Sequence, residues 1–434
     1  MDTAPRLPAR PVFMSPSRLP PPASRLAIVL RVFLPFACGY FLSYLYRTVN
    51  AVIAPDLIAS LSLNAADLGL LTSMYFLTFA FFQLPLGMLL DRYGPRRVEA
   101  LLLLFAAIGA LIFALSSGRV GLICGRALIG LGVSACLMAG FKAFVVWFPP
   151  ARLPAVNGWI MAAGGLGALS STTPVEIALQ IIDWRGLFLG LSLTTLIISA
   201  ILYRLVPDQS GQTPREALGK QWRGVRDVFS SRQFWRVAPL ATCSQATFLS
   251  IQGLWVGPWL RDVAGLERLT AAHHLLATAV AMVAGYLFMG NLAYRLTRFG
   301  ITPLTVASGG ILVFMVTQLA IILEFTDHFF PLWVLFGFFG TSGIVVYAAL
   351  SQSFPAHLAG RVNTGLNWLV FMAAFLSQWG IGAIIDGWPE IRGESAINGY
   401  QAAFSLMLLL QTASFAWFLF GQGNRRKPTQ NPKN

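Results

Sequence analysis

Long runs of apolar residues recur along the whole chain, and short polar or basic segments separate them. A helix that crosses a bilayer needs roughly 20 mainly apolar residues, and twelve runs of about that length are present. The predicted spans are 33–57, 68–90, 98–116, 120–148, 156–180, 186–206, 237–260, 270–293, 303–324, 331–352, 362–385 and 398–421. The pattern therefore predicts an all-α integral membrane protein with twelve transmembrane helices.

A long hydrophilic stretch separates two sets of six predicted spans, and motifs of the first set return in the second. Phe148-Pro149 recurs 206 residues later as Phe354-Pro355, and GMLLDRYG recurs 203 residues later as GNLAYRLTRFG. Two repeats at nearly one offset indicate a duplicated six-helix unit, with a substrate site expected at the interface of the two bundles. The predicted domains are a basic tail at 1–32, a bundle at 33–206, a cytoplasmic linker at 207–236, a bundle at 237–421 and a tail at 422–434.

Composition and charge place the protein in a membrane. The chain is 56% hydrophobic and 11% charged, whereas an average soluble domain carries about 25% charged residues. The net charge of +14 comes mainly from lysines and arginines in alternate loops, as the positive-inside rule describes, so both termini are expected in the cytoplasm and no nucleic acid is expected as a partner. Short loops and the lack of an Asn-x-Ser/Thr sequon favour a bacterial inner membrane. The four cysteines lie in apolar spans, so no disulfide is expected.

Arg47 stands near the middle of the first predicted span. An arginine there costs roughly 2.5–3.5 kcal/mol on insertion scales, so it normally faces a polar cavity or a partner. A guanidinium binds a carboxylate through two parallel N–H···O bonds, which suits a planar anion. Arg47 is therefore a candidate for holding an anionic substrate. Asn50 and Tyr44, three residues to either side, are expected on the same helix face.

Further residues could complete a cavity around this arginine. Tyr75, Phe79 and Gln83 form a stripe at i, i+4 and i+8 on the second predicted span. Lys142 is a second intramembrane cation near a helix end, where it could contact the substrate or only snorkel. Trp259 is expected at the membrane interface. Polar side chains of the second half could touch the substrate or join helices: Gln245, Gln252, Tyr347, Asn367 and Gln378.

The stretch GMLLDRYGPRR resembles the loop signature between the second and third helices of the major facilitator superfamily. Together with the layout of spans, the resemblance covers about residues 30–421. It implies transport by alternating access and a conformational latch between the halves, formed by Gly87, Asp91, Arg92, Gly94 and Arg97. On the residues alone, Gly87 would allow close helix approach and the arginines would hold the loop in the cytoplasm. The second copy has Tyr294 in place of the acid, so no charge latch is expected there.

Within that superfamily, Arg47 and the run Gln83-Leu-Pro look most like the organic-anion carriers, a group that includes anion:cation symporters and sugar-phosphate permeases. Phosphate-ester carriers tend to have a lysine at the Gln83 position, so phosphate esters are less expected as substrates of this chain. The usual proton-binding acids of the symporters are missing, since Tyr46 stands beside Arg47 and the fourth span has no acid between residues 130 and 144.

Two residues remain as possible coupling sites. Arg126, in GRALIGLG, resembles the helix-4 signature of proton-coupled members, although it could simply bond helix carbonyls; Gly130 and Gly132 are expected to serve helix packing. Glu176 is the best-placed acid as a proton carrier or arginine partner, among three that also include Glu324 and Asp386.

The sequence thus predicts a monomeric secondary transporter of a small organic anion or zwitterion, with protons as the expected driving ion and no cofactor. No metal-ligand cluster, nucleotide loop or nucleophile–base pair occurs, so no enzyme activity is expected. Two alternatives stay open. One is an exporter of drugs or siderophore-like metabolites, which the glycine-rich fifth span loosely resembles. The other is a transporter-like sensor that moves nothing, which the missing acid at Tyr294 would permit.

Overall fold

The computed structural model describes residues 25–149, 152–207, 218–323, 329–355, 358–388 and 395–423, and these residues fold almost entirely into helices. The first half contains α1 (Arg25–Ile28), η1 (Val29–Phe33), α2 (Leu34–Thr48), α3 (Asn50–Leu61), α4 (Ala65–Tyr93), α5 (Pro95–Leu115), α6 (Arg119–Val133), α7 (Cys136–Trp147), α8 (Leu153–Ser170), α9 (Thr173–Ala178) and α10 (Trp184–Leu205). The second half contains α11 (Leu218–Phe229), α12 (Arg232–Ser250), η3 (Ile251–Trp255), α13 (Val256–Asp262), α14 (Arg268–Leu296), η4 (Thr297–Phe299), α15 (Pro303–Ile322), α16 (Phe329–Gly340), α17 (Gly343–Gln352), α18 (Ala359–Asp386) and α19 (Ser395–Gly423).

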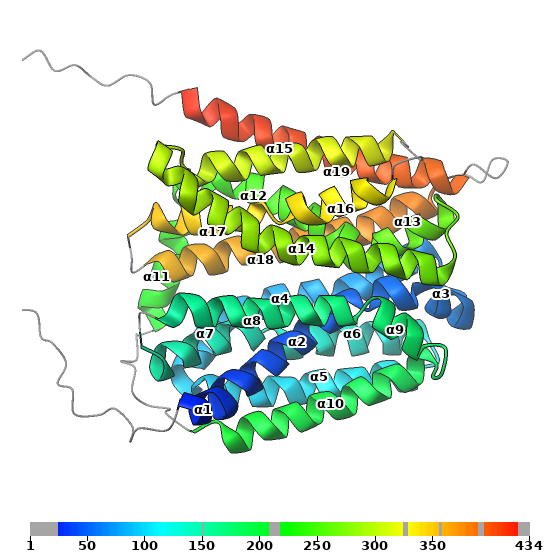
Figure 1. The fold of residues 1–434 in the computed structure, drawn as a ribbon, viewed down its shortest axis with the longest axis horizontal. Coiled ribbons are helices and arrows are strands. Elements are labelled where there is room, and N and C mark those ends of the chain that lie inside the picture. The colour runs from blue at the N-terminus through cyan, green and yellow to red at the C-terminus, as the bar shows by residue number, and fades with distance from the viewer. Residues whose placement is uncertain are drawn as a thin grey trace, which may run out of the picture.

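Ten helical stretches of the described residues are long and apolar enough to cross a membrane. Two less apolar stretches, α8–α9 and α12–η3–α13, run alongside them, which completes the expected set of twelve (Figure 1). The prediction of an all-α membrane protein is confirmed. Most of the predicted first tail and all but two residues of the last lie outside the described residues, and the predicted linker contains α11 and the start of α12.

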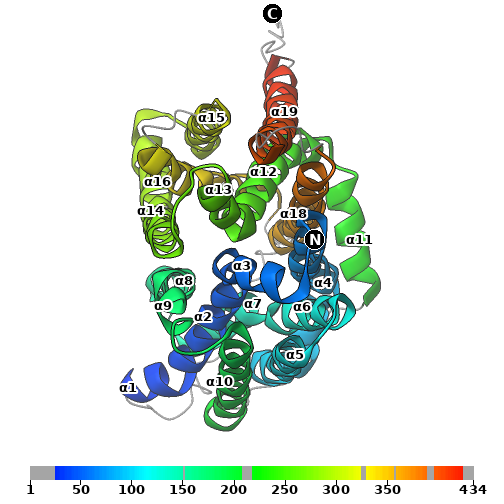
Figure 2. The same cartoon turned by 90° about the vertical axis from the view of Figure 1, so that its right-hand side faces the viewer.

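The helices gather into two groups, with α1–α10 below and α12–α19 above in Figure 1, and Figure 2 shows both groups from one end. The repeated loop motifs lie on matched helices. Both α4 and α14 are 29 residues long, and they begin 203 residues apart. The groups meet where α4 packs against α18 and α8 packs against α14. The interface between the two copies of the repeat is therefore built from equivalent helices.

Several helices are broken at mid-membrane depth, where free backbone groups need polar partners. The first span breaks at Val49, the fourth at Ser134–Ala135 and the tenth at Thr341–Ser342, and a π-helical turn, η3, interrupts the seventh. Two glutamines satisfy carbonyls that these breaks expose. Gln83 Nε2 donates to the carbonyl of Ser134 at 3.2 Å, and Gln245 Nε2 donates to the carbonyl of Gly340 at 2.8 Å.

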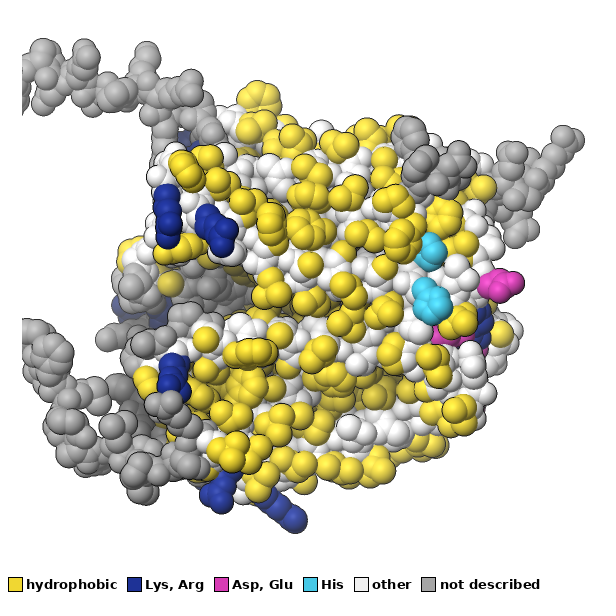
Figure 3. Space-filling model, in the orientation of Figure 1, with side chains coloured by type: hydrophobic (Ala, Val, Ile, Leu, Met, Phe, Trp, Pro, Cys, Tyr) yellow, Lys and Arg dark blue, Asp and Glu magenta, His cyan; other side chains and the backbone are white. Residues whose placement is uncertain are grey.

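Basic side chains gather at the end of the molecule where the described chain begins with α1 and ends with α19, at the left of Figures 1 and 3. We call this the basic end; it carries the α4–α5 turn with Arg92 and Arg96, and the last turn of α14 with Arg295. The other end, here called the opposite end, carries acidic and histidine side chains on the face shown in Figure 3. The asymmetry expected from the sequence is thus visible on the folded surface.

Candidate substrate site

A cavity of about 340 Å³ lies between the two halves. Its lining runs from Arg47, near the middle of the first span, to Asn363, one turn inside the start of α18 at the basic end. Figure 3 shows the surface hollowed between the halves at that end. The first half supplies Tyr40, Ser43, Tyr44, Arg47, Phe79, Gln83, Val133, Ser134, Leu137, Met138, Phe141 and Met161. The second half supplies Gln245, Leu249, Tyr286, Ile344, Tyr347, Asn363, Asn367, Val370 and Phe371.

Arg47 is held by aromatic rings. Its side chain is 93% shielded, and its Cζ atom lies 4.5 Å from the ring centre of Tyr44, 5.3 Å from that of Phe371 and 5.5 Å from that of Phe79. Cation–π contacts of this kind stabilise a desolvated guanidinium without cancelling its charge. Its Nε atom is buried and has no hydrogen-bond partner among the described residues. Arg47 therefore keeps both charge and donor capacity for a ligand.

The described lining of the cavity carries a net positive charge. Arg47 is the single charged residue among the described residues that line it, and none of the described lining residues is acidic. The other polar groups are neutral hydroxyls and amides from both halves. One of them, Asn363 Oδ1, is buried and has no hydrogen-bond partner in the part of the chain that the structure describes. This arrangement favours a ligand with a negative charge and with hydroxyl groups that an amide can bind.

The structure brings seven of the predicted substrate-binding residues to this cavity: Tyr44, Arg47, Phe79, Gln83, Gln245, Tyr347 and Asn367. Tyr347 and Asn367 are joined to each other, with the tyrosine hydroxyl 3.3 Å from Asn367 Oδ1. Five polar or flexible lining residues were not predicted: Ser43, Met138, Met161, Tyr286 and Asn363. For Asn363 a signal was present, since it follows the repeated Phe-Pro motif.

Four predicted substrate-binding residues do not line the cavity. Asn50 is fully buried and donates from Nδ2 to Thr72 Oγ1 at 2.9 Å, so its side chain joins α3 to α4 and does not line the cavity. Tyr75 is also fully buried, and its hydroxyl donates to the carbonyl of Ser43 at 3.1 Å. Gln252 lies in the π-helical turn, away from the lining, and Lys142 pairs with an acid described below.

The ring of Tyr75 supports Arg47 from behind the cavity wall. It lies 5.9 Å from Cζ of Arg47 and 5.2 Å from Cζ of Arg126, so it stands between two guanidinium groups. Arg126 is fully buried and donates from Nη1 to the carbonyl of Tyr46 at 2.8 Å. This geometry joins α6 to α2 and matches the helix-bonding alternative for Arg126.

Close helix packing at Gly130 and Gly132 is confirmed. A Cβ atom added at Gly130 would lie 2.2 Å from the carbonyl oxygen of Tyr75, and one at Gly132 would lie 2.3 Å from the backbone nitrogen of Ala106. The expected interface position of Trp259 is wrong: its side chain is 4% exposed and its ring centre lies 5.2 Å from that of Trp333, inside the second bundle.

The residues of the predicted latch lie at the turn between α4 and α5. Asp91 forms an ion pair with Lys142 of α7, which explains why Lys142 does not reach the cavity. Gly94 has φ +81, a left-handed conformation that joins the two helices and that glycine adopts without strain. The guanidinium of Arg92 lies over the ring of Tyr93, and Arg97 also has an interaction partner.

The expected close helix approach at Gly87 is wrong for this conformation. No atom of a described residue lies within 4 Å of the position that its Cβ would take. Gly87 lies about two turns from the end of α4. No described helix therefore packs against it in this conformation.

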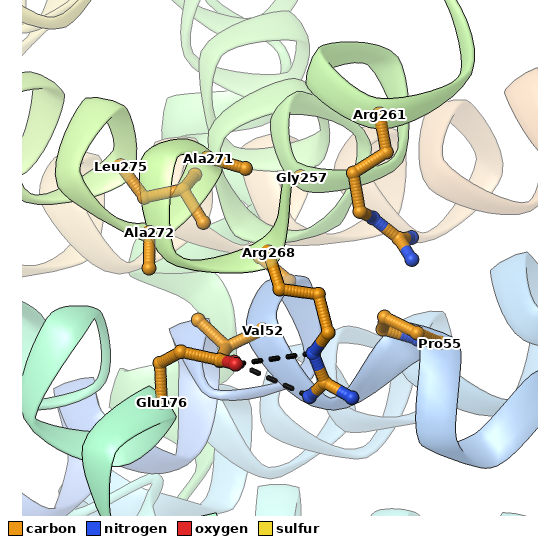
Figure 4. A pocket seen from close by; sticks show the side chains of 10 residues that line it. Val52, Pro55, Glu176, Gly257, Arg261, Arg268, Ala271, Ala272 and Leu275 are labelled. Atoms are coloured by element: carbon orange, nitrogen blue, oxygen red, sulfur yellow. Dashed lines mark hydrogen bonds and ion pairs between the residues drawn. The ribbon is translucent and has the colours of Figure 1, made fainter. Parts of the chain in front are cut away.

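At the opposite end, one arginine joins the halves. Arg268, the first residue of α14, donates to both carboxylate oxygens of Asp56 at 2.8 Å and to those of Glu176 at 3.1 and 3.2 Å. Figure 4 shows Arg268 and Glu176 pointing at each other, with Arg261 to one side. We call Asp56, Glu176 and Arg268 the Arg268 clasp. It links α3 and α9 of the first half to α14 of the second. The other expected acid, Glu324, lies outside the described residues.

A membrane-spanning bundle of two homologous halves, with a ligand-sized cavity between them and a closed opposite end, defines an alternating-access transporter by its architecture. Residues 36–385 match the family described as Major Facilitator Superfamily, and the chain belongs to that family. In three dimensions it resembles the crystal structure of a bacterial homologue of the human lysosomal transporter Spinster, in an inward-facing and unoccupied conformation. That likeness has a TM-score of 0.74 at 17% sequence identity and covers 94% of this chain and 100% of that one.

Several curated relatives are transporters. The uncharacterized transporter YybO of Bacillus subtilis is 24% identical over 89% of this chain and 92% of its own length. The probable sulfoacetate transporter SauU of Cupriavidus necator is 22% identical over 57% of this chain and 60% of its own length. The hexuronate transporter of Bacillus subtilis is 26% identical over 44% of this chain and 45% of its own length. The chain is therefore an MFS membrane transporter rather than an enzyme.

Proposed function

We propose that this protein is a secondary active transporter of a small organic anion. The observation that carries the proposal is the lone charge of Arg47 in a cavity that, among its described lining residues, contains no acid. In a partly desolvated site, one uncompensated guanidinium attracts an anion and repels a cation. A zwitterion would need an acidic partner for its cation, so the described lining favours a simple anion over a zwitterion.

The size and surface of the cavity support the same substrate class. A volume of about 340 Å³ falls at the lower end of small-molecule sites, which span about 300–1,000 Å³. Tyrosine hydroxyls and the amides of Asn363 and Asn367 offer neutral hydrogen bonds from the side that faces Arg47 across the interface. Two relatives are named for the transport of small organic anions: hexuronate has one carboxylate beside hydroxyl groups, and sulfoacetate has a carboxylate and a sulfonate. A hydroxylated carboxylate of this size would pair its negative charge with Arg47 and its hydroxyl groups with the neutral tyrosine hydroxyls and asparagine amides.

The distribution of charge supports an orientation. The basic end carries the arginine-rich α4–α5 turn, so we infer that it faces the cytoplasm of a bacterial inner membrane. The Arg268 clasp then closes the outer side while the cavity opens inward. Alternating access would break the clasp and bring the cytoplasmic helix ends together, which would engage Asp91 and its loop as a latch.

Transport by purified protein in proteoliposomes tests the proposal. Radiolabelled D-glucuronate, D-galactonate and sulfoacetate are supplied as probes, with choline and a neutral sugar as controls. We expect uptake of at least one anion. Arg47→Ala should abolish this uptake. Arg47→Lys keeps the positive charge but loses the paired N–H donors of the guanidinium, so it should raise KM by about tenfold or more, since a charged hydrogen bond contributes about 1.5–3 kcal/mol.

Arg119→Ala is the matched control, because it removes an arginine that lies outside the cavity and pairs with Asp67 on the surface. Its transport should equal that of the wild type. Anion uptake by Arg47→Ala at the wild-type rate, or uptake of the cation or the neutral sugar alone, would overturn the proposal.

A further inference from the structure

An acid that the site does not use lies inside the first bundle. Glu99, one turn into α5, is 0% exposed, and neither of its carboxylate oxygens accepts a hydrogen bond from a described residue. Gly39 of α2 leaves room for it: a Cβ atom at that position would lie 2.3 Å from Glu99 Oε1. The glycine thus leaves the space that the carboxyl group fills.

No basic side chain pairs with Glu99 among the described residues. The groups on the surrounding helices are few. From α7 the thiol of Cys136 lies beside the carboxyl group, 3.8 Å from the same Cβ position at Gly39. From α10 Ser199 Oγ donates to the carbonyl of Ala100, and on α5 itself Arg96 lies over the ring of Tyr203 of α10, one turn closer to the basic end.

An unpaired carboxylate in such surroundings is strongly disfavoured, since burying an ionised group without a partner costs far more than protonating it. Glu99 is therefore neutral in this conformation and carries a proton. Glu176 differs, because it forms an ion pair with Arg268. Of these two acids, Glu99 is the one that the structure leaves free to bind and release a proton.

Glu99 lies one layer behind the wall of the cavity. Gly39 is followed by Tyr40, and Cys136 is followed by Leu137, and both of these followers line the cavity. Glu99 is thus separated by one layer of residues from the cavity that holds Arg47.

We propose that Glu99 is the proton-binding group that couples proton movement to anion movement, an inference that rests on the proposed function. When Glu99 is ionised, its negative charge weakens the positive field of Arg47 and lowers the affinity for an anion. When a proton neutralises it, the field of Arg47 is restored. By linkage, a bound anion favours the protonated carboxyl group to the same degree, so anion and proton travel together. The proton joins a carboxylate oxygen on one side of the membrane and leaves it on the other.

The first test needs no substrate. Infrared difference spectra of the purified protein are recorded through a pH titration. We expect the C=O band of a buried, protonated carboxyl group to persist at neutral pH in the wild type and to be absent in Glu99→Gln. Asp386→Asn removes an exposed acid and should keep the band. A band that survives in Glu99→Gln overturns the proposal. If that variant does not fold, Glu99→Asp gives the same assignment, because the band must then shift.

The second test separates coupling from transport, with whichever labelled anion the wild type moves. One-to-one coupling to a gradient of about one pH unit accumulates a monoanion about tenfold. We expect Glu99→Gln to lose this accumulation but to retain anion exchange at equal pH. Accumulation by Glu99→Gln at the wild-type level refutes the coupling role and leaves the proposed function intact. Failure of the wild type to move any anion refutes the proposed function and leaves the infrared result standing.

Discussion

Replacing Arg268 by glutamine should open the opposite end of the molecule. In the structure this single guanidinium holds two carboxylates of the first half, Asp56 and Glu176, at distances of 2.8–3.2 Å. Glutamine cannot pair with either carboxylate through charge. Glu176, with a side chain only 8% exposed, would be left without its counter-ion while the halves stay closed. Separation of the halves would hydrate Glu176. The substitution therefore removes the ion pairs that hold the closed state and leaves a buried charge that the open state relieves.

The size of the effect follows from the exposure of the partners. The Asp56 pair is screened, with 41% of the Arg268 side chain and 28% of the Asp56 side chain exposed, and contributes about 0.5–1 kcal/mol. The better shielded Glu176 pair contributes about 1.5 kcal/mol, the lower end of the range for charged hydrogen bonds, since it shares the same exposed arginine. A total of about 2 kcal/mol shifts the equilibrium between closed and open states roughly 30-fold.

Double electron–electron resonance, which measures the distance between two spin labels, can detect that shift. Labels are placed at Ile181→Cys, which is 85% exposed between α9 and α10, and at the exposed Glu267→Cys before α14, with the four native cysteines replaced. We expect a longer distance to gain population in Arg268→Gln. Arg261→Gln is the control, because it removes a neighbouring positive charge that forms no ion pair with a described carboxylate. Equal distance distributions in Arg268→Gln and wild type, or the same shift in both variants, would refute the reasoning.

Two further substitutions separate packing from substrate contact. Gly132→Ala should lower thermal stability, because its Cβ would lie 2.3 Å from the nitrogen of Ala106 and overpacking costs about 1–3 kcal/mol; Gly158→Ala, with no atom within 4 Å, should leave the unfolding temperature unchanged. Lys142→Ala should leave the affinity for a transported anion unchanged, because Lys142 pairs with Asp91 outside the cavity; a clear loss of affinity in equilibrium binding would place Lys142 in the substrate site instead.

The helices could be predicted from hydrophobicity, whereas their breaks could not. Apolar runs fix which segments cross the membrane, because every backbone group there must be satisfied within a helix. The break at Val49 has no proline or glycine to announce it. Asn50 was assigned to the face of Arg47 by regular helical spacing, whereas its side chain donates to Thr72 of α4. Periodicity cannot foresee such a partner, because the partner depends on how α4 packs against the first span.

The roles of polar residues were harder to predict than their positions. Gln83 and Gln245 do line the cavity, but each also satisfies a carbonyl of a broken helix, so each serves the fold as well as the site. Glu99 falls at the second position of the predicted span 98–116 and was not counted among the acids inside the membrane, because helix boundaries are the least certain part of a prediction from sequence. The structure begins α5 at Pro95, which carries Glu99 a full turn into the bundle. An earlier helix start therefore places this acid inside the bundle and not at its edge.

The two copies of the repeat differ most where ionisable groups stand. Glu99 is the fourth residue after Pro95 of α5, and the fourth residue after Pro303 of α15 is Ala307, which is equally buried. In the loop motif, Tyr294 replaces the acid of the first copy. The second half gives the cavity only neutral polar and apolar side chains among its described residues, whereas the first half holds both Arg47 and Glu99. Anion and proton would then be bound by one bundle, and their coupling would not depend on the gap between the halves. Rocking of the second bundle would change access to both groups without separating them from each other.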